Sequence, residues 1–470
     1  MGTHHVDSEE PIKRIPIMIV LISGAFIAIL NQTLLGTALP HIMSDLNLDA
    51  NTVQWLQSVF MLVNGIMIPV TAFLIGTFTT RSLFLTAMTL FTAGTLVCAI
   101  APSFTFLLSG RILQAAGAGI IMPLMQTILM LIFPIEKRGT AMGMFGLVIA
   151  FAPAIGPSLS GYIVENFPWR TLFFMILPIA IIDIIIAYFI LKNVTKRTFP
   201  KLDILSIILS TFGFGGFLYG FSIAGTAGWS SQQVIISMIV GLVTLLWFVL
   251  RQFKLEQPIL EFRVFKYKIF TITTVLGMVT FMAMIGAAVV LPLYMQTMLG
   301  FSAFESGLAL LTGAILQGIM NPITGKLFDI YGARYLAIVG LSIIVITTFM
   351  FAFLTKDTSF MYISLVHAFR MMGVAMAMMP VTTAGLNVLP NELMAHGTAV
   401  NNTLRQVSGA IGTALPITIM TTTAIPEEGI QGIIHGVNVS FLVTGIIAIV
   451  GLILSFFVHD RETGKRITLR

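Results

Sequence analysis

The sequence predicts an all-α polytopic membrane protein with fourteen transmembrane helices. Three observations predict this fold class: an apolar composition, a series of long uncharged stretches and an internal repeat. Apolar residues make up 57% of the 470 positions and charged residues only 9%, whereas a soluble domain carries about 25% charged residues. The single cysteine, Cys98, excludes a disulfide framework and a cysteine-rich metal site.

Fourteen stretches are long enough to cross a bilayer as helices, which takes about 20 apolar residues each. The first stretch is too long for a cleavable signal and is expected to be the first span. The division between the seventh and eighth stretches is the weakest, because only "TAGWSS" separates them. The expected spans are 17–39, 53–76, 82–101, 108–133, 140–164, 171–191, 204–225, 232–251, 269–297, 303–325, 335–354, 360–389, 395–420 and 436–458.

The positive residues indicate the orientation. With the N-terminus inside the cell, the outer loops contain only Arg170 and Lys356, and the spans contain Arg111, Arg370 and Arg405. All other Lys and Arg residues then lie on the cytoplasmic side, as the positive-inside rule requires. We therefore expect both termini in the cytoplasm. The net charge of +6 reflects this orientation, so no nucleic-acid partner is expected.

The chain repeats itself. Segment 67–85 aligns without gaps on segment 320–338. Two shorter matches follow in the same order, "FPIEKRGTAMG" with "LPNELMAHGTAVN" and "PAIGPSL" with "GAIGTAL". Parallel repeats with a site between them near mid-bilayer are typical of transporters that rock two bundles. The predicted regions are a cytoplasmic tail (1–16), a six-helix bundle (17–191), a linker with two extra helices and a basic inner loop (192–268), a second six-helix bundle (269–458) and a cytoplasmic tail (459–470).

Three motifs give the chain a family resemblance: "AILNQTLLGTALPHIMSDL", "RILQAAGAGIIMPLMQTI" and "NNTLRQVSGAIGTAL". With them the chain resembles the major facilitator superfamily (MFS), its fourteen-helix drug:proton antiporter branch, and within that branch the lincomycin-exporter-type proteins of Gram-positive bacteria. The resemblance implies a monomer in the bacterial cytoplasmic membrane that exports amphiphilic drugs in exchange for protons by alternating access. No cofactor is expected, because the proton gradient supplies the energy.

The residues also bear on two other classes of function. A physiological exporter of one lipid, peptide or signalling metabolite, with incidental drug efflux, remains open, because embedded arginines suit an anionic head group. An enzyme is not expected, since the sequence has no Walker A, His-Glu-x-x-His or nucleophile-elbow pattern.

The resemblance assigns two motifs to the conformational change. Close helix approach and a bend in the fifth span are implied for the antiporter motif, which is formed here by Gly156, Pro157 and Gly161. A loop motif that holds the two halves together survives in the second half but has lost its acid in the first, where Gly76 takes that place. Its residues are Arg81, Gly325, Asp329, Gly332 and Arg334; Asp329 alone is also consistent with a solvated loop charge.

The family's first-span motif has an Asp where this chain has Asn31, between Leu30 and Thr33. An amide binds hydrogen-bond partners but cannot release a proton near pH 7. We therefore expect the trio Asn31, Gln32 and Thr33 to face a central cavity and the proton to be carried elsewhere.

Arginines within spans are costly and by default functional. Arg111 fits the family's fourth-span motif and is expected in proton coupling or binding. Arg370 is its counterpart, and Arg405 shares a helical stripe with Asn401. Arg370, Asn401 and Arg405 are expected to bind substrate. For each arginine the alternative is a structural hydrogen-bond anchor between helices.

Few ionisable groups are available as proton carriers. Asp183 lies in the middle of the sixth span, although sixth spans are often peripheral supports in this superfamily. Glu305 opens the tenth span, where an acid also favours the helix dipole. His367 lies one turn before Arg370 and titrates near physiological pH when exposed. The remaining expected substrate-lining residues are Trp55, Met61, Met122, Met125, Gln126, Gln296, Gln317 and Asn321.

Overall fold

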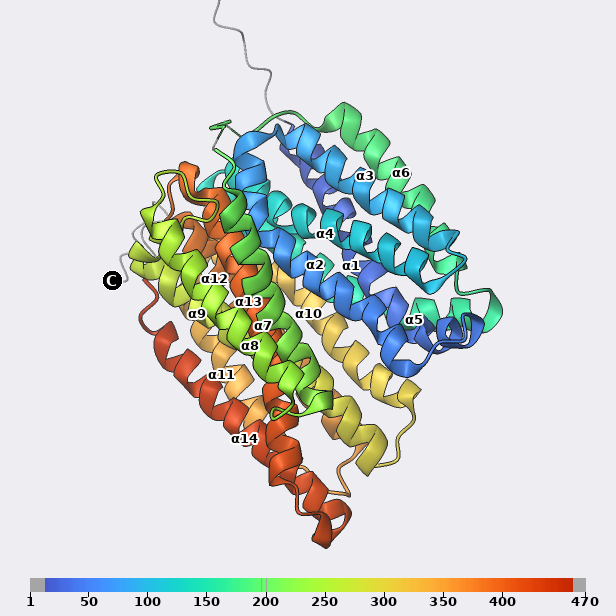
Figure 1. The fold of residues 1–470 in the computed structure, drawn as a ribbon. Coiled ribbons are helices and arrows are strands. Elements are labelled where there is room, and N and C mark those ends of the chain that lie inside the picture. Colours follow the sequence, from blue (N-terminus) through green and yellow to red (C-terminus); the bar gives the residue numbers. More distant parts are fainter. Residues whose placement is uncertain (1–12, 196, 200, 460–470) are drawn as a thin grey trace, which may run out of the picture.

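The computed structural model describes residues 13–195, 197–199 and 201–459, which form fourteen long α-helices and contain no β-strand. The predicted all-α fold class is confirmed. Both ends of the described chain lie on the same side of the bundle, at the upper left in Figure 1. Most of the two predicted tails lies outside the described residues, and residues 14–16 belong to the first helix.

The first six helices form one half of the molecule, coloured blue to green in Figure 1. Helix α1 packs against α5 and α6, and α4 packs against α2 and α3. Polar caps define some of the helix starts: Asp49 accepts a hydrogen bond from the Thr52 amide at 2.8 Å, and Thr79 accepts one from the Ser82 amide at 3.1 Å. The helices are α1 (Arg14–Asp45), α2 (Ala50–Thr77), α3 (Thr80–Ala99), α4 (Phe104–Ile132), α5 (Arg138–Asn166) and α6 (Thr171–Ile190), with the short turn η1 (Ile135–Lys137) before α5.

The last six helices form the other half, coloured yellow to red in Figure 1, with the same neighbours. Helix α9 packs against α13 and α14, and α12 packs against α10 and α11. Gly332 ends α10 with a φ of 78°, a left-handed conformation that favours glycine. The helices are α9 (Lys268–Leu293), α10 (Ala303–Tyr331), α11 (Ala333–Phe351), α12 (Phe360–Asn387), α13 (Met394–Thr423) and α14 (Ile430–Ser455), with the short turns η3 (Tyr294–Met298), η4 (Asn391–Leu393) and η5 (Pro426–Glu428).

Two inserted helices, α7 (Ile204–Ala227) and α8 (Gln232–Lys254), form a hairpin that lies over the seam between the halves (Figure 1). Helix α7 contacts α2 of the first half and α13 of the second. Tyr219 stacks on Trp55 of α2 with the ring centroids 5.7 Å apart. On the other side, Trp229 Nε1 donates to Thr418 Oγ1 of α13 at 2.6 Å. The hairpin therefore contacts both halves.

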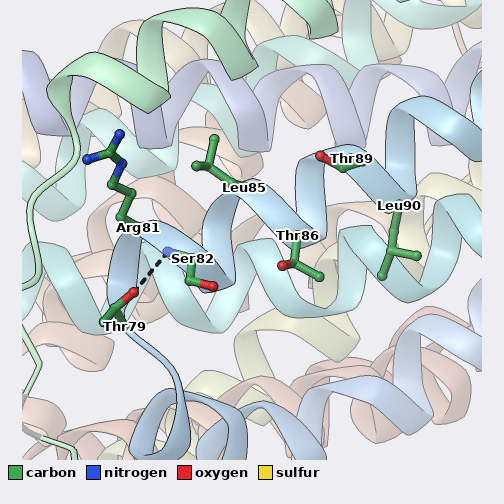
Figure 2. Close-up of a pocket in the computed structure, with 7 residues that line it drawn as sticks. All are labelled: Thr79, Arg81, Ser82, Leu85, Thr86, Thr89 and Leu90. Atoms are coloured by element: carbon green, nitrogen blue, oxygen red, sulfur yellow. Dashed lines mark hydrogen bonds between the residues drawn. The ribbon is translucent and has the colours of Figure 1, made fainter.

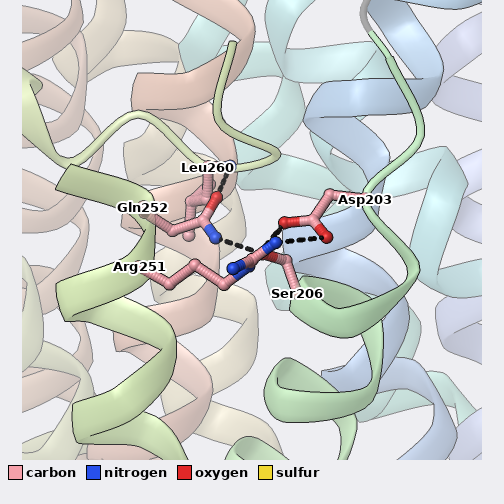
Figure 3. Close-up of polar contacts among 5 residues, drawn as sticks. All are labelled: Asp203, Ser206, Arg251, Gln252 and Leu260. Atoms are coloured by element: carbon pink, nitrogen blue, oxygen red, sulfur yellow. Dashed lines mark hydrogen bonds and ion pairs between the residues drawn. The ribbon is translucent and has the colours of Figure 1, made fainter. Parts of the chain in front are cut away.

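A polar network fixes the inner end of this hairpin (Figure 3). The Arg251 guanidinium donates to both carboxylate oxygens of Asp203, at 2.8 and 3.0 Å, and lowers the pKa of that carboxyl. Ser206 also donates to Asp203, and Gln252 connects Ser206 to the amide of Leu260 in the following loop. The start of α7, the end of α8 and the loop containing η2 (Phe262–Lys266) are thus held together.

Thirteen of the fourteen long helices are long and apolar enough to cross a membrane by length and composition, and α13 is the exception. Many of its polar residues are buried, among them Asn401, Asn402 and Arg405. These buried side chains face other helices and not lipid. A polar composition is therefore compatible with the position of α13 inside the bundle. This places its polar face where two halves meet, since α13 also contacts α2 and α4.

Candidate functional site

The two halves meet most closely where the cytoplasmic end of α5 crosses α10. Three glycines lie at this crossing: Gly139 and Gly143 on α5 and Gly325 on α10. A Cβ at Gly325 would collide with the backbone oxygen of Gly139 and lie 3.1 Å from the Cα of Gly143. Only glycines allow the two backbones to approach this closely.

Replacing Gly325 with alanine should push α5 and α10 apart, because the added Cβ meets backbone, which cannot rotate away. The matched control is Gly307→Ala on the same helix, where a Cβ would meet nothing within 4 Å. We expect cysteine crosslinking between the cytoplasmic ends of α5 and α10 to fall in the first variant only. Equal crosslinking in both variants would show that this contact is not tight.

Asp329 of α10 binds the N-terminus of α5 in the other half. Its carboxylate accepts hydrogen bonds from the Gly139 amide at 2.8 Å, the Thr140 amide at 2.9 Å and the Thr140 hydroxyl at 2.5 Å. Free amides and the dipole at a helix N-terminus favour an anion at this position. The structure therefore places Asp329 in a contact between the halves, not in a solvated loop.

The corresponding loop of the first half has no such contact through an acid, because Gly76 occupies the equivalent position. Arg81 instead lies over the ring of Tyr188 on α6, 4.2 Å from its centroid. Figure 2 shows Arg81 at one end of a cavity of about 500 Å³ that runs along α3. A second cavity, of about 490 Å³, lies between α7 and α8 and includes Tyr219 and Gln232. Neither cavity is lined by residues of both six-helix halves.

Two further polar contacts cross the seam on the cytoplasmic side. Arg138 Nη1 donates to Asn387 Oδ1 at 3.0 Å, and Asn402 Nδ2 donates to Gln126 Oε1 at 2.5 Å. Gln126 was expected to line the cavity, but Asn402, Arg138 and Asn387 were not singled out from the sequence. The adjacent Asn401 and Asn402 were a usable signal, because two amides side by side on a spanning helix cannot both share one face.

The first-span trio lies next to the antiporter motif. A Cβ at Gly156 would collide with Thr33 Oγ1, so this glycine lets α5 approach α1. Asn31 is 2% exposed, and its Nδ2 has no hydrogen-bond partner among the described residues. Gln32 is half-buried. Pro157 is exposed, and a Cβ at Gly161 would meet nothing within 4 Å, so only Gly156 serves close packing here.

Arg111 is fully buried and bound within the first half. Its Nε donates to the Leu56 carbonyl of α2 at 3.1 Å, its Nη1 donates to Gln114 at 2.9 Å, and its guanidinium lies 4.2 Å from the centroid of the Phe60 ring. Gln114 in turn donates to Thr95 of α3 at 2.8 Å. Asn31 does not bond to Arg111 in this conformation. These contacts match the structural alternative, a hydrogen-bond anchor between helices.

Arg370 occupies a similar place in the second half. Its Nη1 donates to Thr348 of α11, and its Nη2 donates to the Ala283 carbonyl of α9 at 2.9 Å. His367, one turn earlier, is buried against Gly313 of α10, which has no side chain to exclude the imidazole. Both residues thus connect helices of one half.

Arg405 differs from the other two buried arginines. It is 6% exposed, and neither its Nε nor its Nη1 has a partner among the described residues. Its guanidinium lies 5.0 Å from the centroid of the Phe281 ring on α9. Asn401, one turn before it, is 3% exposed, and its Oδ1 also lacks a partner.

The two acids proposed as proton carriers are in different environments. Asp183 is 5% exposed, accepts a hydrogen bond from Ser23 of α1 through Oδ1, and has no partner at Oδ2. Glu305 forms a capping box with Ser302: its carboxylate accepts from the Ser302 amide at 2.8 Å, and its own amide donates to the Ser302 hydroxyl. Glu305 therefore stabilises the start of α10, as the helix-dipole alternative predicts.

The structure divides the remaining expected lining residues. Trp55 and Met61 on α2 are exposed, at 42% and 54%, and Gln296 donates to Ser306 at 2.7 Å. Asn321 is buried against Gly146 of α5, across the seam. The others are buried or half-buried, namely Met122, Met125, Gln126 and Gln317.

Comparison with known proteins identifies the family of this chain. The model of the Major Facilitator Superfamily matches residues 21–413. The chain belongs to the major facilitator superfamily. Like other members of the superfamily it is an integral membrane protein and a transporter, not an enzyme.

The relatives also confirm the predicted branch. The chain is 56% identical over 452 residues to the uncharacterized MFS-type transporter YcnB of Bacillus subtilis, covering 95% of this chain and 96% of the relative. It is 43% identical over 463 residues to the lincomycin resistance protein LmrB of Listeria monocytogenes, covering 96% and 98%. Among solved structures, the human organic anion transporter MFSD10 matches with a TM-score of 0.67 at 12% identity, covering 93% of this chain and 99% of that one. At this low sequence identity, the similarity to MFSD10 shows a shared fold and nothing more.

Proposed function

We propose that this transporter exports amphiphilic drugs across the bacterial cytoplasmic membrane in exchange for protons, by alternating access. The observation that carries the proposal is the seam on the cytoplasmic side. Asp329, Gly325 and Asn402 contact the other half through hydrogen bonds and close glycine packing. Such contacts can break and re-form as the halves rock. The relation to a lincomycin resistance protein supports drugs as the exported compounds.

The proposal needs one chain, a proton gradient and no cofactor. Asp183 is the leading candidate for the proton carrier. One of its carboxyl oxygens is buried and has no hydrogen-bond partner among the described residues. Because a buried charge without a partner is costly, this environment favours the protonated carboxyl unless a partner moves into contact. Glu305 and His367 are weaker candidates, since Glu305 caps a helix and His367 packs inside one half.

The test is transport of radiolabelled lincomycin into proteoliposomes. We expect an acidic lumen to accelerate uptake, because molecules inserted with their cytoplasmic side outward would exchange lumenal protons for drug. A protonophore should remove this acceleration. Uptake that is equally fast with and without the pH gradient would contradict proton exchange.

A second function, export of one physiological metabolite with incidental drug efflux, is favoured by three buried arginines, Arg111, Arg370 and Arg405, none of which forms an ion pair among the described residues. Competition separates the two functions. Inhibition of uptake by several chemically unrelated drugs would support the multidrug exporter, and inhibition by a single chemical class would support the specific one.

A further inference from the structure

Arg405 presents a positive charge in the interior without any internal acceptor. Its side chain starts eleven residues after the cytoplasmic end of α13 at Met394, about 16 Å into the bundle at about 1.5 Å per residue. Buried guanidinium groups in proteins are normally hydrogen-bonded, because an unpaired buried charge is costly. Arg111 follows this rule, with acceptors for its Nε and its Nη1. Arg405 donates to no acceptor among the described residues.

No acid of the described part of the chain neutralises this charge. Arg405 takes part in none of the ion pairs formed by the described residues. The two acids that are half-buried or buried next to the seam and the first helices are bound elsewhere, Asp183 to Ser23 and Asp329 to the N-terminus of α5. The charge of Arg405 therefore has to be met by something that is not a side chain of this chain in this conformation.

The surroundings of Arg405 are shaped for an amphiphile. Phe281 covers one side of the guanidinium, and the ring reaches this position because residue 409 is glycine: a Cβ there would lie 2.8 Å from the ring. One turn earlier on α13, the side-chain oxygen Oδ1 of Asn401 is buried and accepts no hydrogen bond from a described residue. A charge, an acceptor and an aromatic face thus lie on neighbouring turns of α13 and α9.

The place of this group relative to the seam is also informative. Asn402, next to Asn401, makes the hydrogen bond to Gln126 that joins the halves on the cytoplasmic side. Arg405 lies one turn deeper than that contact. A ligand at Arg405 would therefore lie at mid-depth, directly beyond the closed cytoplasmic end.

We propose that Arg405, with Asn401 and the ring of Phe281, binds the oxyanion of an amphiphilic substrate, a carboxylate on an apolar or aromatic body. This proposal rests on the proposed export function and names one chemical class among the exported compounds. A carboxylate supplies the acceptors that Nε and Nη1 lack, and a neighbouring N–H or O–H of the same ligand supplies a donor to Asn401.

The test is direct binding to the purified full-length protein in phosphatidylcholine nanodiscs. The probes are 11-(dansylamino)undecanoic acid, its neutral methylamide and a trimethylammonium analogue of the same length. We expect the wild-type protein to bind the carboxylate on the order of tenfold more tightly than the methylamide, the value of one charge-assisted hydrogen bond. Arg405→Gln should remove this preference and leave methylamide binding in place.

Further variants distinguish a lost site from a lost fold. Arg405→Glu should prefer the ammonium probe, whereas a misfolded protein would prefer none. Lys356→Gln in an exposed outer loop is the control for net charge and should keep the carboxylate preference. Equal wild-type affinity for the carboxylate and the methylamide, or an unchanged preference in Arg405→Gln, would overturn the proposal.

One more arm separates a transported ligand from a lipid head group. In nanodiscs that contain phosphatidylglycerol, the carboxylate preference should persist, and its loss would assign the site to an anionic lipid and overturn the proposal. Binding needs no gradient, so this experiment can fail while drug–proton exchange succeeds, or the reverse.

Discussion

Replacing Asp329 with alanine should open the cytoplasmic end of the molecule and lower transport. The variant loses three hydrogen bonds from Gly139 and Thr140 in the other half, and hydrogen bonds to a charged group contribute about 1.5–3 kcal/mol each. Such contributions are not additive. A net loss of about 3 kcal/mol shifts the balance between closed and open states on the order of 100-fold.

The measurement is the distance between nitroxide labels at Lys137→Cys and Asn391→Cys, which lie in exposed turns on the cytoplasmic side of the two halves. We expect a longer distance in Asp329→Ala and an unchanged one in Asp357→Asn, a control in an exposed outer loop. Since Cys98 is buried, it should not take up label. Identical distance distributions with and without the Asp329 carboxylate would show that this contact does not set the conformation.

Asp183→Asn should uncouple drug accumulation from the pH gradient. Asparagine keeps the size of the side chain and the contact with Ser23 but cannot bind and release a proton. One unit of pH gradient is worth 1.36 kcal/mol per proton, so the variant should lose about tenfold of accumulation per proton exchanged. The assay is lincomycin accumulation in proteoliposomes with a lumen one pH unit more acidic than the medium.

Two further variants test whether this effect is specific to Asp183. Asp357→Asn should keep wild-type accumulation, and Glu305→Gln tests the competing carrier, which the structure assigns to a helix cap. Counterflow of drug without a gradient should persist in Asp183→Asn, since it requires rocking but no net proton movement. Full gradient-driven accumulation in Asp183→Asn would remove Asp183 from the mechanism.

The fold could be predicted from the sequence. The long apolar stretches indicate the spanning helices, and the gapless match of 67–85 with 320–338 indicates two similar halves. The helix ends were harder to predict: the first helix runs from Arg14 to Asp45, well beyond the apolar stretch 17–39. Lipid requires only the central part to be apolar, and the ends extend into the interfacial region. Apolarity therefore locates a span better than it locates the two ends of its helix.

The site was only partly predictable. The family resemblance identified Asp329 and Gly156 through their motifs, and the cost of a charge within a span identified Arg405. Sequence patterns could not tell that Arg111 is satisfied by a backbone carbonyl of α2 while Arg405 is not, since hydrogen-bond partners between helices depend on rotation and crossing angles. Nor could they show that Asn402 faces Gln126, a contact between residues 276 positions apart.

The polar character of α13 has a consequence for biogenesis. An isolated helix with Asn401, Asn402 and Arg405 in its inner half would pay for each of these groups on entering lipid, and arginine alone costs about 2.5–3.5 kcal/mol at a helix centre. Helix α13 is therefore expected to remain at the insertion machinery until α14 emerges from the ribosome. The last two helices would then enter the bilayer together, with α13 shielded by partners already assembled.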